Sequence, residues 1–188
     1  RNLVLAAGLS ILAMGADADE ALIISNATYD GQRDIRAAHT AQKAGRALRD
    51  AGFGVTAIRD ASVQRMADEV TALFERVDEN DRIVVFLSGY FAEDGVSGLV
   101  MARDLRGLSA FNLRARGLHL VRAPQGVTVA QGEPALLAER VSSGLLRDDV
   151  SVAQALSGSD VRAFGYLPSH VGFLTALGDA PGRVDEDA

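Results

Sequence analysis

The chain of 188 residues contains no cysteine and no tryptophan, and it has only 3 histidines. The lack of cysteine excludes disulfide bonds, thiolate nucleophiles and cysteine-ligated zinc. His39, His119 and His170 are far apart in the sequence and lack the short spacings of zinc ligands, so they are expected to be surface or packing residues. We therefore expect neither a metal nor a cofactor.

The sequence also lacks a P-loop and a Gly-x-Gly-x-x-Gly motif after a strand, so nucleotide binding has little support. Aromatic residues make up 5% of the chain and the formal net charge is −6, which argues against nucleic acid as the main partner. The hydrophobic content of 48% is typical of a globular protein. The length suits a single domain, expected at residues 19–178, with residues 179–188 as an acidic, flexible tail.

The apolar run Leu3–Met14 is too short to span a bilayer comfortably. Arg1 precedes it and Ala16-Asp17-Ala18 follows it, which is the layout of a secretory signal with cleavage after Ala18. Residues 1–18 are therefore predicted to be a signal peptide of a periplasmic or secreted protein. The alternative is a buried helix of the mature fold, and the protein would then be cytoplasmic.

What the chain does contain is a run of five apolar residues, Ile83–Leu87, which predicts a parallel strand buried on both faces. The run stops at Ser88-Gly89-Tyr90-Phe91, where a glycine frees the backbone. Ligands and catalytic groups collect at the carboxyl end of a central strand in open α/β sheets. This segment is therefore the first place to look for a function.

Residues 21–88 alternate between strand and helix patterns. Strands are predicted at 21–25, 53–58 and 83–88, with helices at 34–51 and from a cap at Asp60 or Ser62 to Val77. Short connections of this kind predict an α/β fold, a three-layer α/β/α sandwich with a mostly parallel sheet. The remaining segments predict strands at 97–101, 127–130 and 161–167, helices at 135–146, 152–156 and 169–177, and an arginine-rich segment at 105–120 with an ambiguous helical pattern.

Three segments of the chain, taken in order, resemble the large-subunit domain of the caspases, metacaspases and bacterial orthocaspases. They are "ALIISNATYDG", "LRDAGFGVTAIRDAS" and "DRIVVFLSGYFAEDGVSGLVM". These proteins are the cysteine proteases of peptidase family C14. The resemblance covers residues 20–101 and implies a caspase-like sheet. In that family, a histidine in a Gly-His-Gly loop and a cysteine after the next core strand cleave the peptide bond.

The resemblance places the family's histidine on Tyr90 and the following glycine on Phe91. It places the cysteine near Gln131, Gly132 and Glu133, just past the strand at 127–130. A tyrosine, with an ordinary pKa of about 10, keeps its proton at neutral pH and cannot act as the base. These departures imply a catalytically inactive pseudoprotease, not an enzyme, that binds a protein or peptide.

Three alternatives remain for Tyr90 and Phe91: apolar filling of a vacated pocket, a retained peptide-binding cleft, or a new catalytic role. The last would need a nucleophile, for which Ser88, Ser142 and Ser143 are candidates. The candidate ligand-binding residues are Asn26, Asp30, Ser88, Tyr90 and Phe91.

Two other classes of function stay open. The first is an enzyme of unrelated chemistry at the same strand-end cleft, which would need a polar cluster and a strongly perturbed carboxylate. The residues to inspect for it are Asn26, Asp30, Tyr90, Gln131 and Glu133. The second is a structural or assembly module that forms a homodimer through an edge strand, for which Val161–Leu167 is the candidate.

Overall fold

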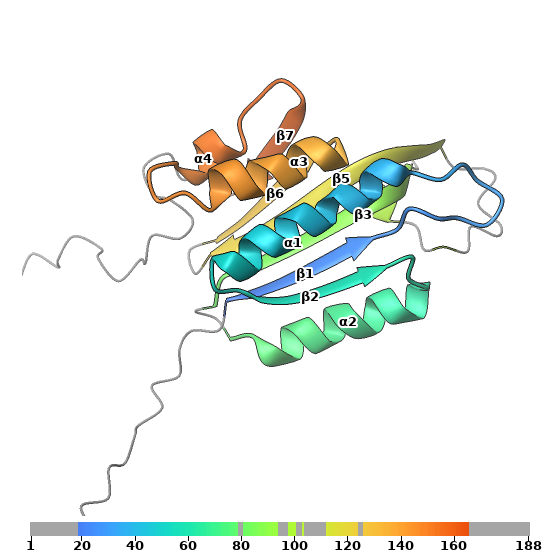
Figure 1. Ribbon diagram of the computed structural model, residues 1–188, viewed down its shortest axis with the longest axis horizontal. Coiled ribbons are helices and arrows are strands. Elements are labelled where there is room, and N and C mark those ends of the chain that lie inside the picture. Colours follow the sequence, from blue (N-terminus) through green and yellow to red (C-terminus); the bar gives the residue numbers. More distant parts are fainter. Residues whose placement is uncertain are drawn as a thin grey trace, which may run out of the picture.

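The computed structural model describes residues 19–78, 81–93, 98–100, 103, 112–123 and 126–165, with the backbone alone for 92, 93, 98–100, 112–123, 126, 127 and 164. Within these residues one sheet has the strand order β2-β1-β3-β5-β6-β7, and β4 pairs with β3 outside this path (Figure 1). The strands are β1 (Glu20–Ser25), β2 (Gly54–Arg59), β3 (Ile83–Glu93), β4 (Gly98–Val100), β5 (Asn112–Ala123), β6 (Gly126–Gly132) and β7 (Val161–Gly165).

The half of the sheet formed by β1, β2 and β3 is parallel. β1 lies in its centre and is buried at five of its six positions, and Ile83–Phe86 of β3 are buried as well. Continuous apolar runs of this kind are what a strand covered on both faces requires. The α/β class and the three predicted parallel strands are therefore confirmed.

In the other half, β5, β6 and β7 pair antiparallel, each with the strand before it in the sheet. The parallel pairing that we predicted for most of the sheet is thus confined to β1–β3. The helical interpretation of 105–120 is wrong for residues 112–120, which belong to β5. The strand predicted at 127–130 is part of β6, and it is not the neighbour of β3 because β5 lies between them. Since β5 is antiparallel to both strands, β6 runs parallel to β3.

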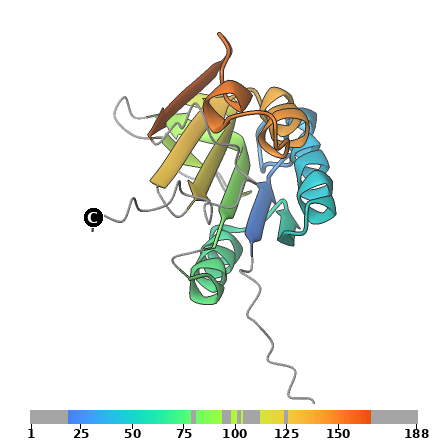
Figure 2. The same cartoon turned by 90° about the vertical axis from the view of Figure 1, so that its left-hand side faces the viewer.

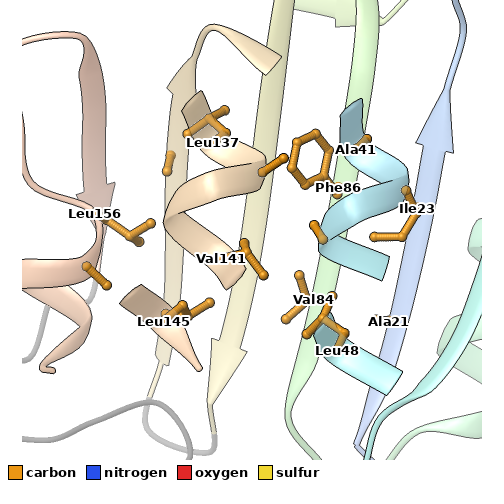
Figure 3. Close-up of a cluster of buried hydrophobic side chains, with 14 of the residues drawn as sticks. Ala21, Ile23, Ala41, Leu48, Val84, Phe86, Leu137, Val141, Leu145 and Leu156 are labelled. Carbon is orange, nitrogen blue, oxygen red and sulfur yellow. The ribbon is translucent and has the colours of Figure 1, made fainter. Parts of the chain in front are cut away.

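Helices cover both faces and complete the three layers (Figure 2). One face carries the 3-10 helix η1 (Arg36–Thr40), α1 (Ala41–Asp50), α3 (Pro134–Arg140), the π-helix η2 (Val141–Leu145) and α4 (Val152–Ala155). Their apolar side chains pack on Val84 and Phe86 of β3 and on Ala21 and Ile23 of β1 (Figure 3).

The opposite face carries α2 (Val63–Arg76), whose Met66 and Leu73 pack on Leu22, Ile24 and Val85. The two predicted capping residues have different roles. The Ser62 hydroxyl accepts the Arg65 amide and caps α2, whereas Asp60 does not cap the helix.

Several other predicted elements are confirmed. The short strand at 97–101 corresponds to β4, the helices at 135–146 and 152–156 to α3 with η2 and to α4, and the last strand to β7. The predicted signal peptide, the helix at 169–177 and the acidic tail lie outside the described residues.

Candidate functional site

The carboxyl ends of β1, β2 and β3 lie at one edge of the sheet, where Ser25 is in register with Arg59 on one side and with Ser88 on the other. β3 continues beyond this level to Glu93, so Gly89 and Tyr90 lie beside the chain that leaves β1. The amide of Asn26 donates to the Ser88 carbonyl at 2.9 Å. The candidate site is this edge of the sheet.

Tyr29 is the buried centre of this edge, with 4% of its surface exposed. Its hydroxyl donates to the Asn26 carbonyl at 3.0 Å and accepts the Tyr90 amide at 2.8 Å. Burial, which disfavours the phenolate, raises the pKa of Tyr29 to about 12. Tyr29 is therefore a neutral hydroxyl that links two backbone segments.

Tyr90 is half-buried and lies against Tyr29, with the ring centroids 4.9 Å apart and the ring planes inclined at 57°. Its ring also contacts the apolar group formed by Ala27, Ile35 and Ala38. Its hydroxyl donates to the Arg33 carbonyl at 3.0 Å. The side chain is thus held at both its ring and its hydroxyl by the chain between β1 and α1.

Gly89 allows the close approach of the two tyrosines. It has a φ of +156°, and a Cβ atom there would lie 2.2 Å from the Tyr29 hydroxyl and 3.0 Å from the Asn26 carbonyl oxygen. These distances are too short for any side chain. The glycine predicted to free the backbone after the strand is therefore a packing requirement.

Asn26 is fully buried, and its side chain joins the end of β1 to the end of β2. Its Oδ1 accepts the Ala61 amide at 2.9 Å, and its Nδ2 lies 3.4 Å from Met66 Sδ. A buried amide with internal partners is a structural group, because a ligand would have to replace these bonds. The prediction of Asn26 as a ligand-binding residue gains no support from this geometry.

Asp60 connects the same strand ends from the β2 side. It is a non-glycine residue with a positive φ of 46°, and its Oδ1 accepts the amides of Ala27 and Thr28, each at 2.8 Å. The other carboxylate oxygen lies 3.8 Å from His39 Nε2. Asp60 therefore fixes the turn in which Tyr29 lies.

Ser88 is fully buried, and its hydroxyl has no hydrogen-bond partner in the described part of the chain. Nε2 of His39 likewise has no hydrogen-bond partner in this part of the chain. These two side chains consequently make no hydrogen bond with each other, and an activated serine needs such a bond to its base. The geometry does not assemble a nucleophile at Ser88.

Gln131, Gly132 and Glu133 lie two strands away from β3, because β5 intervenes. Ser88 of β3 and Gly132 of β6 are both in register with Gly117 of β5, so with neighbouring strands about 4.8 Å apart they lie about 10 Å apart. Glu133 is exposed, and its carboxylate caps α3 by accepting the Leu136 amide at 3.2 Å. A Cβ at Gly132 would lie 3.0 Å from the Asp160 carbonyl oxygen, so the backbone is close-packed there.

Ser142 and Ser143 lie in η2, away from this edge. α3 begins at the carboxyl end of β6, and about 1.5 Å of rise per residue takes these serines towards the opposite edge of the sheet. Their hydroxyls donate to helix carbonyls, including that of Glu139. The structure therefore does not bring either serine to Tyr90.

The two remaining candidates also differ from Tyr90 in position. Asp30 is exposed and lies 3.6 Å from the guanidinium of Arg103. Phe91 is 5% exposed and, by the alternation of side chains along β3, belongs to the opposite face from Tyr90. Phe91 therefore does not fill the space next to Tyr90, whereas Tyr29 does.

A surface hollow of about 650 Å³ lies beside the Tyr90 contact. Its described lining residues are Gln32, Arg33, Asp34 and Arg36, all of them exposed. Arg33 connects the hollow to Tyr90, whose hydroxyl bonds to its carbonyl.

Within the described residues, no group of three or more His, Asp or Glu side chains is arranged to hold a metal ion. Among the helices of the same residues, none has both the length and the apolar character needed to cross a membrane.

Sequence reasoning placed Tyr90 in this site, but it did not identify Tyr29, Gly89 or Asp60 as its structural partners. The available signal was the Asn-x-x-Tyr pattern after the first strand, with Tyr29 three residues beyond Asn26. It shows that a tyrosine follows the strand, and only the fold shows that its hydroxyl reaches the Tyr90 amide.

Comparison with curated proteins finds no match to this chain. Comparison with protein families matches residues 19–113 to the caspase domain of the C14 peptidases. The matched segment contains β1, β2, β3, the helices between them and the whole Tyr29–Tyr90 contact. The chain therefore belongs to the caspase-domain family.

Proposed function

We propose that this caspase-domain protein is catalytically inactive and acts by binding a protein or peptide partner. The observation that carries the proposal is the state of Tyr90, which lies at the expected position of the family's histidine. Its ring packs on Tyr29 and its hydroxyl donates to the Arg33 carbonyl at 3.0 Å. A side chain held in this way has a structural role, and as a tyrosine it is no base at neutral pH.

The second half of the family's catalytic pair has no counterpart either. The chain contains no cysteine, and none of Gln131, Gly132 and Glu133 offers a comparable nucleophile. The intervening β5 also separates these residues from Tyr90 by two strand spacings. Restoring both side chains would therefore not by itself recreate a close histidine–cysteine pair.

The hollow beside Tyr90 is the proposed binding place. Arg33 and Arg36 supply positive charge there, Asp34 supplies negative charge, and Gln32 can both donate and accept hydrogen bonds. All four side chains are exposed, so a partner reaches them without opening the core.

Activity is tested with fluorogenic peptides that carry Arg, Lys or Asp before the scissile bond. We expect no turnover above that of the heat-denatured protein. Turnover that the Tyr90→Ala variant abolishes would overturn the proposal. Binding is tested separately by NMR with the same peptides, where we expect shifts at residues 32–36 that weaken in Arg33→Ala, and the absence of shifts there would remove the hollow as the binding place.

A second candidate function is assembly through β7. This strand forms one end of the described sheet, so one of its edges is unpaired there and another copy of the chain can add to it. Size-exclusion chromatography with light scattering tests this candidate. A monomer at all accessible concentrations excludes it, while a dimer that Ala163→Pro dissociates supports it.

We also propose that residues 1–18 are a signal peptide, which would direct the protein to the periplasm or the medium. The support is the sequence layout alone, an apolar run followed by Ala16-Asp17-Ala18. Mass spectrometry of the protein recovered from each compartment tests this. Uncleaved protein confined to the cytoplasm would contradict it.

A further inference from the structure

The outer edge of β2 is an accessible backbone edge of the described sheet. β2 is the terminal strand beside β1, and no described strand pairs with its other side (Figure 1). All six of its residues are at least partly exposed, whereas β1 next to it is buried at five of six positions. Unpaired edges of this kind accept an extended chain as an additional strand.

The hydrogen-bonding pattern identifies which backbone groups are available. The amides of Gly54 and Asp60 donate to the Asp19 and Ser25 carbonyls of the β1 side, at 2.8 and 3.1 Å. In a parallel ladder, alternate residues bond to one neighbour, so the intervening N–H and C=O groups point to the other side. The outward groups of β2 therefore belong to Val55, Ala57 and Arg59.

One of these outward backbone groups already has a hydrogen-bond partner. The Val55 carbonyl accepts the guanidinium of Arg49 at 3.5 Å, at the long limit of a hydrogen bond and at an exposed position. A backbone amide of an incoming strand can replace this contact. The guanidinium would then be released towards the side chains of that strand.

The α1 side of the edge is positively charged. Arg46 and Arg49 lie one helical turn apart on α1, and Arg59 lies on the same face as Val55 and Ala57 by the alternation of the strand. All three are exposed, and none forms an ion pair with a carboxylate of the described residues. A Cβ at Gly45 would contact Val55 at 3.6 Å, which places this side of α1 above β2. The only acidic residue of α1 is Asp50 at its end.

The α2 side of the edge is different. Arg65 pairs with Glu69 at 2.6 Å, and Arg76 pairs with Glu20 at 3.3 Å, so the arginines there are neutralised. The side chains of β2 on this face are those of Thr56 and Ile58, which are uncharged. The two sides of an added strand would therefore meet different surroundings.

We propose that the outer edge of β2 binds an extended acidic segment of a partner protein, which adds a strand to the sheet. Its backbone bonds to Val55, Ala57 and Arg59. Acidic side chains at every second position face Arg46, Arg49 and Arg59, and uncharged side chains alternate with them towards α2. This interaction is independent of the Tyr90 site, so the failure of either proposal leaves the other intact.

The test uses a fluorescent peptide, Thr-Glu-Val-Glu-Val-Glu-Thr with blocked ends, and the full chain. We expect binding by fluorescence anisotropy that weakens with salt, since exposed charges are screened within about 8 Å at physiological ionic strength. The same peptide with Lys in place of Glu should not bind. In NMR hydrogen exchange, the peptide should protect the amides of Val55, Ala57 and Arg59, while those of Thr56 and Ile58, already bonded to β1, should change little.

Two variants separate charge from backbone pairing. The double variant Arg46→Glu, Arg49→Glu should raise the dissociation constant at least about tenfold, while Arg162→Glu on β7 at the other end of the sheet should change it less than about twofold. Ala57→Pro removes an outward amide without removing a bond to β1, and it should also abolish protection. The proposal is overturned if no binding occurs at millimolar peptide, if the exchange changes map to β7, or if both variants bind like the original protein.

Discussion

The backbone amide of Tyr90 donates to the hydroxyl of Tyr29 at 2.8 Å, although 61 residues separate the two in the chain. The same hydroxyl donates to the Asn26 carbonyl at 3.0 Å. One buried oxygen atom therefore ties the end of β3 to the turn after β1. The Tyr29 hydroxyl thus acts as both a donor and an acceptor. The aromatic ring of Tyr90 packs against the ring of Tyr29 beside these bonds.

The first prediction compares the two tyrosine hydroxyls. Tyr29→Phe leaves a part-buried amide and a buried carbonyl without their partner and should lower the free energy of unfolding by about 1–3 kcal/mol. Tyr90→Phe removes an exposed bond to the Arg33 carbonyl, which water can replace, and should cost less than about 1 kcal/mol. Urea denaturation of both variants checks the order. Equal losses would show that the buried hydroxyl has no special role.

The second prediction concerns Gly89. In Gly89→Ala the new methyl group would lie 2.2 Å from the Tyr29 hydroxyl, so the two segments must separate. Overpacking of this kind costs about 1–3 kcal/mol. The double variant Gly89→Ala, Tyr29→Phe removes the clashing oxygen, so its loss should be smaller than the sum of the two single losses. Additive losses in thermal or urea unfolding would contradict the proposed contact.

The sequence predicted the parallel half of the sheet well because β1 and the first part of β3 are continuous apolar runs. β5 was missed because its pattern, NLRARGLHLVRA, changes its alternation at Gly117-Leu118 and has apolar residues at both strand-like and helix-like spacings. What makes it a strand is the long ladder that pairs Ile83–Glu93 with Asn112–Arg122. Pairing over such a separation is not encoded in local periodicity.

The sequence predicted where the candidate site lies in the sheet, but not which side chains pack together there. The stop after Leu87 indicated correctly where the parallel pairing with β1 ends, at Ser88, but the strand itself does not end there and continues to Glu93. The sequence did not indicate that Tyr29 would fill the space beside Tyr90, or that Phe91 would belong to the other face. These outcomes depend on the register between β1 and β3 and on the path of the turn after β1, both of which are tertiary features.

The third prediction concerns the turn that holds Tyr29. Asp60→Ala removes the acceptor of the Ala27 and Thr28 amides and leaves alanine at a positive φ of 46°. We expect a loss of about 2–4 kcal/mol, because both the bonds and the backbone preference are lost. Asp60→Asn keeps an acceptor and tolerates this backbone conformation, so it should lose less than half as much. Similar losses in the two variants would show that the negative charge, rather than the geometry, is what matters.

The last prediction uses the titration of Tyr29. A tyrosine in the unfolded chain ionises with a pKa of about 10, whereas burial raises the pKa of Tyr29 in the folded protein to about 12. Between these values the unfolded chain has lost the proton that the folded chain keeps, so the stability that Tyr29 contributes is complete below pH 10 and is lost as the pH rises through 12. Two pKa units correspond to about 2.7 kcal/mol at most.

Tyr29→Phe has no such group and should therefore lose stability less steeply over the same range, although it starts from a lower value. Urea denaturation of both proteins between about pH 9 and pH 11.5 measures the two slopes. The tyrosinate absorbance, followed in the folded protein, should show one late step that this variant lacks. Parallel stability curves for the two proteins would mean that Tyr29 ionises as readily in the folded state as in the unfolded one, and that its hydroxyl is not enclosed between Asn26 and Tyr90.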